Sequence, residues 1–153
     1  MINLATFIPR AVVQGIPLLY GSTGEIMTEK SGNLNLGIPG VMYVGAISGV
    51  IGSFFYETSL TDKSEINGAL AILIPLLCSL LGSLVMGLIY SFLTVTLRAN
   101  QNVTGLALTT FGVGFGNFFG GSLIKISGSD VPSIALSATS AYFSKSLPFA
   151  GKL

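Results

Sequence analysis

The chain has 153 residues, of which 50% are hydrophobic and 8% are charged, whereas soluble domains carry about 25% charged residues. An ordinary soluble domain is therefore excluded. The seven Lys and Arg are scattered, and the chain has one Cys and no His. These counts exclude a nucleic-acid-binding stripe, a zinc cluster, a Cys–His nucleophile pair and a disulfide, so neither nucleic acid, nor a metal, nor another cofactor is expected.

Three long uncharged stretches dominate the chain, at residues 31–56, 66–97 and 99–124. Each exceeds the roughly 18 apolar residues that indicate a membrane-spanning helix. We therefore predict an all-α fold, a polytopic bundle of transmembrane helices. The predicted spans are residues 4–24, 34–56, 70–97 and 103–124, and residues 125–153 are expected to form an external loop or short helices.

The first predicted span is followed by a stretch rich in helix breakers. Arg10 follows apolar residues and no small-residue cleavage pattern comes after it, so the segment is interpreted as a retained helix rather than a signal peptide. Residues 25–40 then pass from polar to apolar, with breakers at Gly32, Gly37, Pro39 and Gly40. We expect a loop that leads into a broken or re-entrant second helix.

Glycines recur every four residues within two of the predicted spans. This spacing allows the backbones of two helices to approach closely in a bilayer. We therefore predict helix-packing faces at Gly45 and Gly49, and at Gly112, Gly116 and Gly120.

The charged residues between the spans give a predicted orientation. Cytoplasmic flanks carry an excess of Lys and Arg, so Arg98 is placed inside and the acidic loop 57–65 outside. Lys125, Lys145 and Lys152 would then lie outside, against the same rule.

The break at residues 32–40 has two interpretations. Irregular backbone within a bilayer is tolerated only where it is buried in protein or lines a water-filled cavity, and interrupted helices offer N–H groups and carbonyls to polar solutes. A solute pathway is therefore predicted at Asn33, Asn35, Gly37, Pro39 and Gly40. The alternative is a simple Gly/Pro turn between two ordinary spans, with Asn33 and Asn35 as helix caps.

Two stretches of the chain resemble one family of membrane proteins. The two stretches are EKSGNLNLGIPGVMYVGA at residues 29–46 and RANQNVTGLAL at residues 98–108. They resemble, in this order, the N-terminal half of ABC importer permeases of the nucleoside/simple-sugar type, which are related to the branched-chain amino acid and ribose permeases. The closing segment 143–152 resembles the external segment that precedes the second half of such permeases. The chain departs from the family pattern at Pro39, where many members have Glu, so no role of that glutamate is carried over.

The resemblance implies a transport subunit that is not itself an enzyme. It implies a translocation pathway for a nucleoside or related small polar solute in the bacterial plasma membrane. The implied partners are a second permease subunit, a cytoplasmic ATPase subunit, an extracytoplasmic solute-binding lipoprotein and membrane lipid. No Gly-x-x-x-x-Gly-Lys-Ser/Thr phosphate loop is present in the sequence.

Two polar or aromatic positions in the last predicted span are further pathway candidates. Phe111 belongs to a run of phenylalanines at helical spacing that would stack on a nucleobase, or would face lipid or neighbouring helices instead. Asn117 would line the path, or would form a hydrogen bond between helices. A different class of function also stays open, namely a small membrane scaffold or a half-size secondary transporter that works without ATP.

Overall fold

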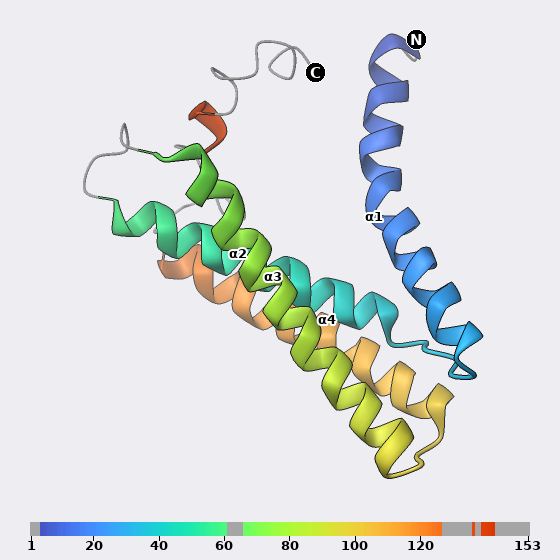
Figure 1. Cartoon of the computed structure of the whole chain (residues 1–153). Coiled ribbons are helices and arrows are strands. Elements are labelled where there is room, and N and C mark those ends of the chain that lie inside the picture. The colour runs from blue at the N-terminus through green and yellow to red at the C-terminus, as the bar shows by residue number, and fades with distance from the viewer. Residues whose placement is uncertain (1–3, 61–65, 127–135, 137–138, 143–153) are drawn as a thin grey trace.

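The fold of the described residues is entirely helical. The computed structural model describes residues 4–60, 66–126, 136 and 139–142. Four long helices follow one another in the chain (Figure 1). They are α1 (Leu4–Lys30), α2 (Ile38–Ser59), α3 (Gly68–Ser91), which the π-helical turn η1 (Phe92–Thr96) extends, and α4 (Gln101–Ile126). The predicted all-α fold is confirmed.

The irregular backbone lies between the first two helices and not within the second. Helix α1 continues past the predicted end at residue 24 to Lys30, because Glu25 to Lys30 contains neither Gly nor Pro. Residues 31–37 are irregular, and α2 is continuous from Ile38. Pro39 lies in the first turn of α2, where its missing N–H removes no helical hydrogen bond. Gly40 is therefore part of a regular helix.

The last helix is longer than expected, since Lys125 and Ile126 still belong to α4 rather than to an external loop. Of the region after α4, residues 136 and 139–142 are described, and the segment 143–152 lies outside the described residues.

Asparagine side chains cap the N-termini of two of the helices. The Oδ1 atom of Asn67 accepts the N–H of Ala69 at 3.1 Å at the start of α3. Asn100 does the same for α4, since its Oδ1 accepts the N–H of Asn102 at 3.0 Å. These bonds satisfy N–H groups that lack a partner within the helix. Just before Asn100, Arg98 has a φ of 51°, in the left-handed region, and there the chain reverses from η1 into α4.

Helix α2 is the central element of the bundle, because it packs along both α3 and α4 while α1 contacts it more sparsely. Figure 1 shows α1 leaning away from the other helices towards its N-terminal end. The buried core between α2, α3 and α4 consists of Val44, Met86, Tyr90 and Leu108.

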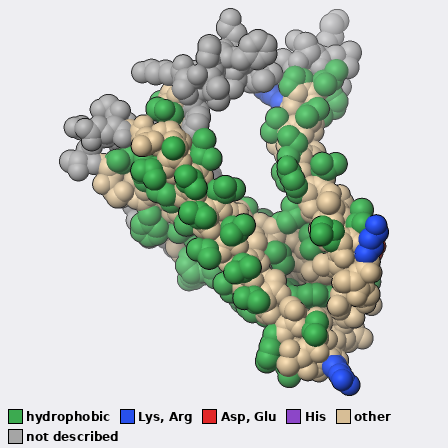
Figure 2. Space-filling model, in the orientation of Figure 1, with side chains coloured by type: hydrophobic (Ala, Val, Ile, Leu, Met, Phe, Trp, Pro, Cys, Tyr) green, Lys and Arg blue, Asp and Glu red, His purple; other side chains and the backbone are tan. Residues whose placement is uncertain are grey.

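The outer faces of the helices are apolar. Leu80, Leu84 and Leu88 on α3 are each more than half exposed, and hydrophobic side chains cover the visible face along the bundle and α1 (Figure 2). Among the described residues, two helices, Ile38–Ser59 and Gly68–Thr96, are long and apolar enough to cross a membrane. The predicted membrane helical bundle is therefore supported most directly by α2 and α3, and the number of crossings stays a prediction.

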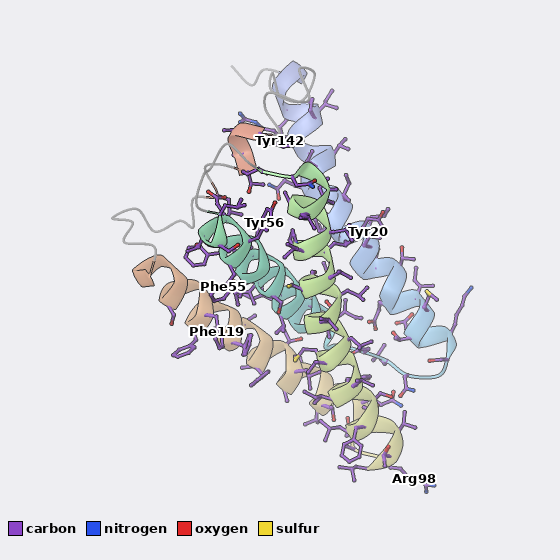
Figure 3. The ribbon with its side chains drawn as sticks, turned by 60° about the vertical axis from the view of Figure 1, so that its left-hand side comes forward. Tyr20, Phe55, Tyr56, Arg98, Phe119 and Tyr142 are labelled. Carbon is purple, nitrogen blue, oxygen red and sulfur yellow. The ribbon has the colours of Figure 1, made fainter. Side chains whose placement is uncertain are left out.

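The two ends of the bundle differ in the residues that they carry. Arg98 lies at one end, and Tyr56 and Tyr142 lie at the other (Figure 3). At the second end the carboxylate of Glu57 accepts a hydrogen bond from the hydroxyl of Thr139 at 3.1 Å, so the short segment 139–142 docks beside the end of α2. Residues 61–65 of the acidic loop are outside the described part of the chain.

Candidate functional site

Residues 34–37 form an irregular segment that ends in a turn and runs along the first two turns of α4. The N–H of Leu34 donates to Oε1 of Gln101 at 2.9 Å, and the hydroxyl of Thr109 donates to the carbonyl oxygen of Leu36 at 2.8 Å. Gln101 and Thr109 are separated by about 12 Å along the helix at 1.5 Å per residue. The segment therefore enters the bundle from the end of α4 rather than crossing over its surface.

Two further helices hold the other polar groups of this segment. The hydroxyl of Tyr90, in the buried core of α3, donates to the carbonyl oxygen of Leu34 at 2.8 Å. From α1, Oε1 of Glu25 accepts the N–H of Asn35 at 3.1 Å. Backbone groups away from water must be paired, and here side chains from α1, α3 and α4 replace the partners that a regular helix would provide.

Asn35 stabilises the segment from within. Its side chain is buried, with 6% exposure, and its Oδ1 accepts the N–H of Gly37 at 2.9 Å. The carbonyl oxygen of Gly37 then accepts the N–H of Val41 in the first turn of α2. This contact is a local turn that precedes α2, whose N-cap residue is Gly37 and has no side-chain cap.

Glycines make the close approach of the segment to α4 possible. A Cβ on Gly105 would lie 2.9 Å from the backbone nitrogens of both Leu36 and Gly37. About two turns further along α4, a Cβ on Gly112 would lie 2.7 Å from the Cα of Gly40. Both contacts are with backbone atoms, which cannot move aside as a flexible side chain can.

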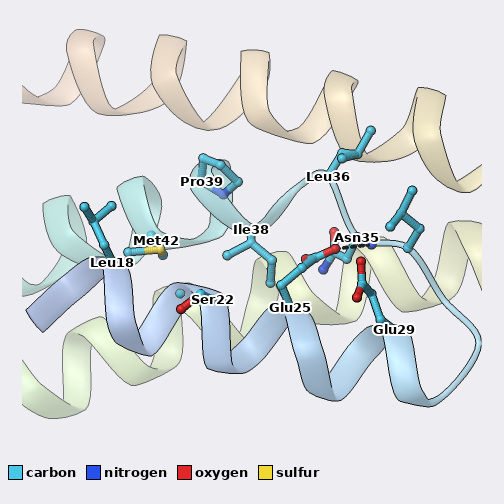
Figure 4. A pocket seen from close by; sticks show the side chains of 11 residues that line it. Leu18, Ser22, Glu25, Glu29, Asn35, Leu36, Ile38, Pro39 and Met42 are labelled. Atoms are coloured by element: carbon cyan, nitrogen blue, oxygen red, sulfur yellow. Dashed lines mark hydrogen bonds between the residues drawn. The ribbon is translucent and has the colours of Figure 1, made fainter. Parts of the chain in front are cut away.

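A groove lies between α1 and the junction of the segment with α2 (Figure 4). Its volume is about 420 Å³, within the range of small-molecule sites. Four of the lining residues are polar, and the remainder are apolar or glycine. The lining consists of Leu18, Gly21, Ser22, Glu25, Glu29, Leu34, Asn35, Leu36, Ile38, Pro39 and Met42.

The two carboxylates of the groove are on one face of α1. Glu25 and Glu29 are one helical turn apart, so they lie on the same side of the helix, and both are drawn towards Asn35 in Figure 4. The Oε1 atom of Glu25 is bonded to Asn35, but its Oε2 atom is buried and has no hydrogen-bond partner among the described residues. A buried acceptor without a donor is costly, so this oxygen needs an explanation beyond the fold itself.

A second hollow lies between α2 and α4, nearer the C-terminal half of α4. Tyr43 and Asn117 line this hollow, and the hydroxyl of Tyr43 donates to Oδ1 of Asn117 at 3.2 Å. The volume of the hollow is about 500 Å³, and small residues including Gly116, Gly120 and Gly121 form part of its wall.

The predicted pathway residues are divided between these places. Asn35 and Pro39 line the groove, whereas Gly37 and Gly40 are buried against α4. Asn33 is half-buried in the irregular stretch. Asn117 lines the second hollow, and Phe111, with 57% exposure, lies outside both.

The predicted packing glycines lie against neighbouring helices. Positions 45 and 49 on α2 face α3, where a Cβ on Gly49 would lie 3.1 Å from the carbonyl oxygen of Pro75. On α4, Gly112 faces the backbone of Gly40, Gly116 faces the ring of Tyr43, and a Cβ on Gly120 would lie 3.7 Å from Ile47.

Comparison with known proteins identifies the family. The family model for the permease component of the branched-chain amino acid transport system matches residues 7–150. The chain belongs to this permease family. No solved structure matches it.

Relatives within the permease family differ in the solutes that their names give. The putative glucose ABC transporter permease protein TsgC13 of Haloferax volcanii is 30% identical over 135 residues, which are 88% of this chain and 37% of the relative. The guanosine ABC transporter permease protein NupQ of Bacillus subtilis is 29% identical over 111 residues, 72% of this chain and 33% of the relative. The nucleoside ABC transporter permease protein NupC of Lactococcus lactis is 30% identical over 120 residues, 76% of this chain and 34% of the relative. The chain thus spans about a third of the length of these permeases.

Two of the side chains that build the site, Tyr90 and Gln101, were not assigned to it from the sequence. Tyr90 lies in a long apolar stretch of the sequence. A buried tyrosine hydroxyl needs a hydrogen-bond partner, and this need is the feature of the sequence that could have indicated its role. Gln101 lies at the start of the helix that begins within the second permease-like stretch. Only the fold brings it to Leu34, and brings Thr109, eight residues further along the helix, to Leu36.

Proposed function

We propose that this chain is part of the permease subunit of an ATP-driven importer and contributes to its translocation pathway. Membership of the permease family supports the transport role. The names of the relatives, which include glucose, guanosine and nucleoside permeases, support a nucleoside or a related small polar solute.

The observation that carries the proposal is the irregular segment 34–37 and its groove. Regular helices suffice to cross a bilayer, whereas an irregular segment held by side chains of three helices is expected where a polar solute is handled. Asn33, Asn35, Gly37, Pro39 and Gly40 are proposed to form this part of the path. Asn117 is proposed to extend it through the second hollow, and Phe111 is proposed to face the path from α4.

The proposal includes the other subunits of such a system. A cytoplasmic ATPase subunit would supply the energy, an extracytoplasmic solute-binding lipoprotein would deliver the solute, and a second permease subunit would complete the pathway. The location is then the plasma membrane, with the chain crossing it several times.

The test is solute uptake by cells that carry the native gene. Uptake of radiolabelled guanosine and of glucose is compared between the wild-type strain, a deletion strain and the complemented deletion strain. We expect the deletion to abolish saturable uptake of one of these solutes and complementation to restore it. Uptake should stop when ATP is depleted by arsenate. Uptake that survives ATP depletion but stops when an uncoupler dissipates the proton gradient would contradict the proposal in favour of a secondary transporter.

A further inference from the structure

The polar wall of the groove beside α1 consists of Ser22, Glu25, Glu29 and Asn35, of which Asn35 carries the N–H donors of its amide and the other three present acceptors. Glu25 and Glu29 contribute carboxylates, which accept hydrogen bonds and donate none when they are ionised. The hydroxyl of Ser22 already donates to the carbonyl oxygen of Leu19 at 3.0 Å, so its lone pairs remain as acceptors. No Lys or Arg is among the residues that line the groove.

The opposite wall is apolar and comes from the start of α2. Ile38, Pro39 and Met42 face α1 across the groove (Figure 4). A solute that fits must therefore offer donors on one side and an apolar ring face on the other. Phosphorylated solutes do not fit, because their charge would be placed beside two carboxylates with no cation in the wall.

We propose that Glu29 and the unpaired oxygen of Glu25 bind the two adjacent hydroxyls of an uncharged sugar ring, the ribose of a nucleoside or a hexose, and so select ribose-bearing over deoxyribose-bearing solutes. The inference rests on the proposed transport function. It also explains the unsatisfied Oε2 atom of Glu25, which would gain its donor from the solute. That atom is covered in the structure, so the hydroxyl reaches it only when the solute displaces the side chains that now close over it.

The geometry of the carboxylate pair supports a diol rather than a single donor. Vicinal hydroxyls present two O–H donors side by side, and two carboxylates one helical turn apart on α1 present acceptors side by side. A deoxy analogue lacks one of the donors and would leave one acceptor of the groove unpaired, which is the arrangement by which a polar site discriminates most strongly.

The test compares guanosine with 2′-deoxyguanosine in cells that carry the native gene. Initial uptake rates of both are measured at low concentration in the wild-type strain and in strains with Glu29→Gln or Glu25→Gln. The glutamine at position 25 keeps an oxygen for the N–H of Asn35, so the bond that holds the segment is preserved. Thr23→Val is the matched control, because Thr23 is on the same helix and donates within it to Leu19 but does not line the groove.

We expect the wild type and Thr23→Val to prefer guanosine about tenfold, and both glutamine variants to lose most of this preference, as expected for one lost charge-assisted hydrogen bond. Membrane levels of each variant are measured by immunoblot. A solute-binding receptor is the same in every strain, so a change in the ratio belongs to the groove. Glu29 is exposed, so Glu29→Gln is expected to fold even where Glu25→Gln does not.

Two outcomes would overturn the inference. One of them leaves the proposed transport function intact, and the other refutes it as well. An unchanged ratio in Glu29→Gln at a normal membrane level would refute diol selection while leaving the transport function intact. Absence of uptake of both guanosine and glucose in the wild type relative to the deletion strain would refute the proposed function and the inference together.

Discussion

Single hydrogen bonds decide how residues 34–37 are held. Thr109 and Thr110 are adjacent on α4, yet their hydroxyls have different partners. Thr109 donates to the carbonyl oxygen of Leu36 at 2.8 Å, whereas Thr110 donates to the carbonyl oxygen of Leu106 in its own helix at 3.0 Å. The carbonyl oxygen of Leu106 already accepts a helical N–H, while that of Leu36 lies outside any helix. Loss of the Thr109 hydroxyl would therefore leave the carbonyl oxygen of Leu36 without this partner, whereas loss of the Thr110 hydroxyl would leave the carbonyl oxygen of Leu106 with its helical N–H.

This difference gives a prediction for a matched pair of variants. Thr109→Val should destabilise the protein by about 0.5–1.5 kcal/mol, the net contribution of a typical hydrogen bond, and Thr110→Val should change stability by less than about 0.5 kcal/mol. Thermal unfolding of the detergent-purified protein measures both. Equal melting temperatures for the two variants would show that the bond to Leu36 does not hold the segment.

At the scale of helices, contact between α2 and α4 depends on paired glycines. A Cβ on Gly112 would lie 2.7 Å from the Cα of Gly40 and 2.9 Å from its carbonyl carbon. Backbone atoms at these distances force the helices apart. By contrast, Gly114, on the same helix, has open space where its Cβ would be.

The element-scale prediction compares these two positions. Gly112→Ala should lower stability by about 1–3 kcal/mol through overpacking, and because α4 would move away from α2, it should also weaken the bonds of Gln101 and Thr109 to the segment. Gly114→Ala should be neutral or slightly stabilising, since alanine favours the helix by up to about 1 kcal/mol. The measurement is the melting temperature of each variant in detergent. A similar decrease of the melting temperature in both variants would contradict close packing at Gly112.

At the scale of the whole molecule, the predicted orientation in the membrane depends on which charged residues lie at each end of the bundle. Lys30 ends α1, and Arg98 precedes α4 at the same end, as the bond between Leu34 and Gln101 requires. Glu57 is at the opposite end of the bundle, beside residues 139–142. Arg10, near the start of α1, and Lys125, near the end of α4, lie towards that opposite end. Since cytoplasmic flanks are enriched in Lys and Arg, Lys30 and Arg98 favour a cytoplasmic location for their own end, whereas Arg10 and Lys125 favour the reverse. We keep the prediction that the end with Arg98 is cytoplasmic.

Cysteine labelling tests this orientation. In a background in which Cys78, the single cysteine of the chain, is replaced by alanine, Ser59→Cys should react with an impermeant maleimide in intact cells. Ser31→Cys should react only after the cells are opened. Both positions are exposed and lie at helix ends, so differences in reactivity report sidedness rather than burial. The reverse pattern would invert the predicted topology.

The sequence by itself determined the fold class and the family. Uncharged stretches longer than a bilayer requires, interrupted by Gly, Pro and polar residues, leave few alternatives to membrane helices. The residues of the two permease-like stretches were sufficient for the resemblance, which the family match confirmed.

Only the tertiary structure decided where the irregular segment lies and what holds it. Helix α1 extends to Lys30, so the break precedes α2. The pairing of Asn35 with Glu25, and of Leu34 and Leu36 with Tyr90, Gln101 and Thr109, joins residues up to 73 positions apart. Local sequence rules describe the helix on which a side chain lies, but they carry no information about which distant backbone group will need its hydrogen bond. That need arises only when the helices pack and exclude water.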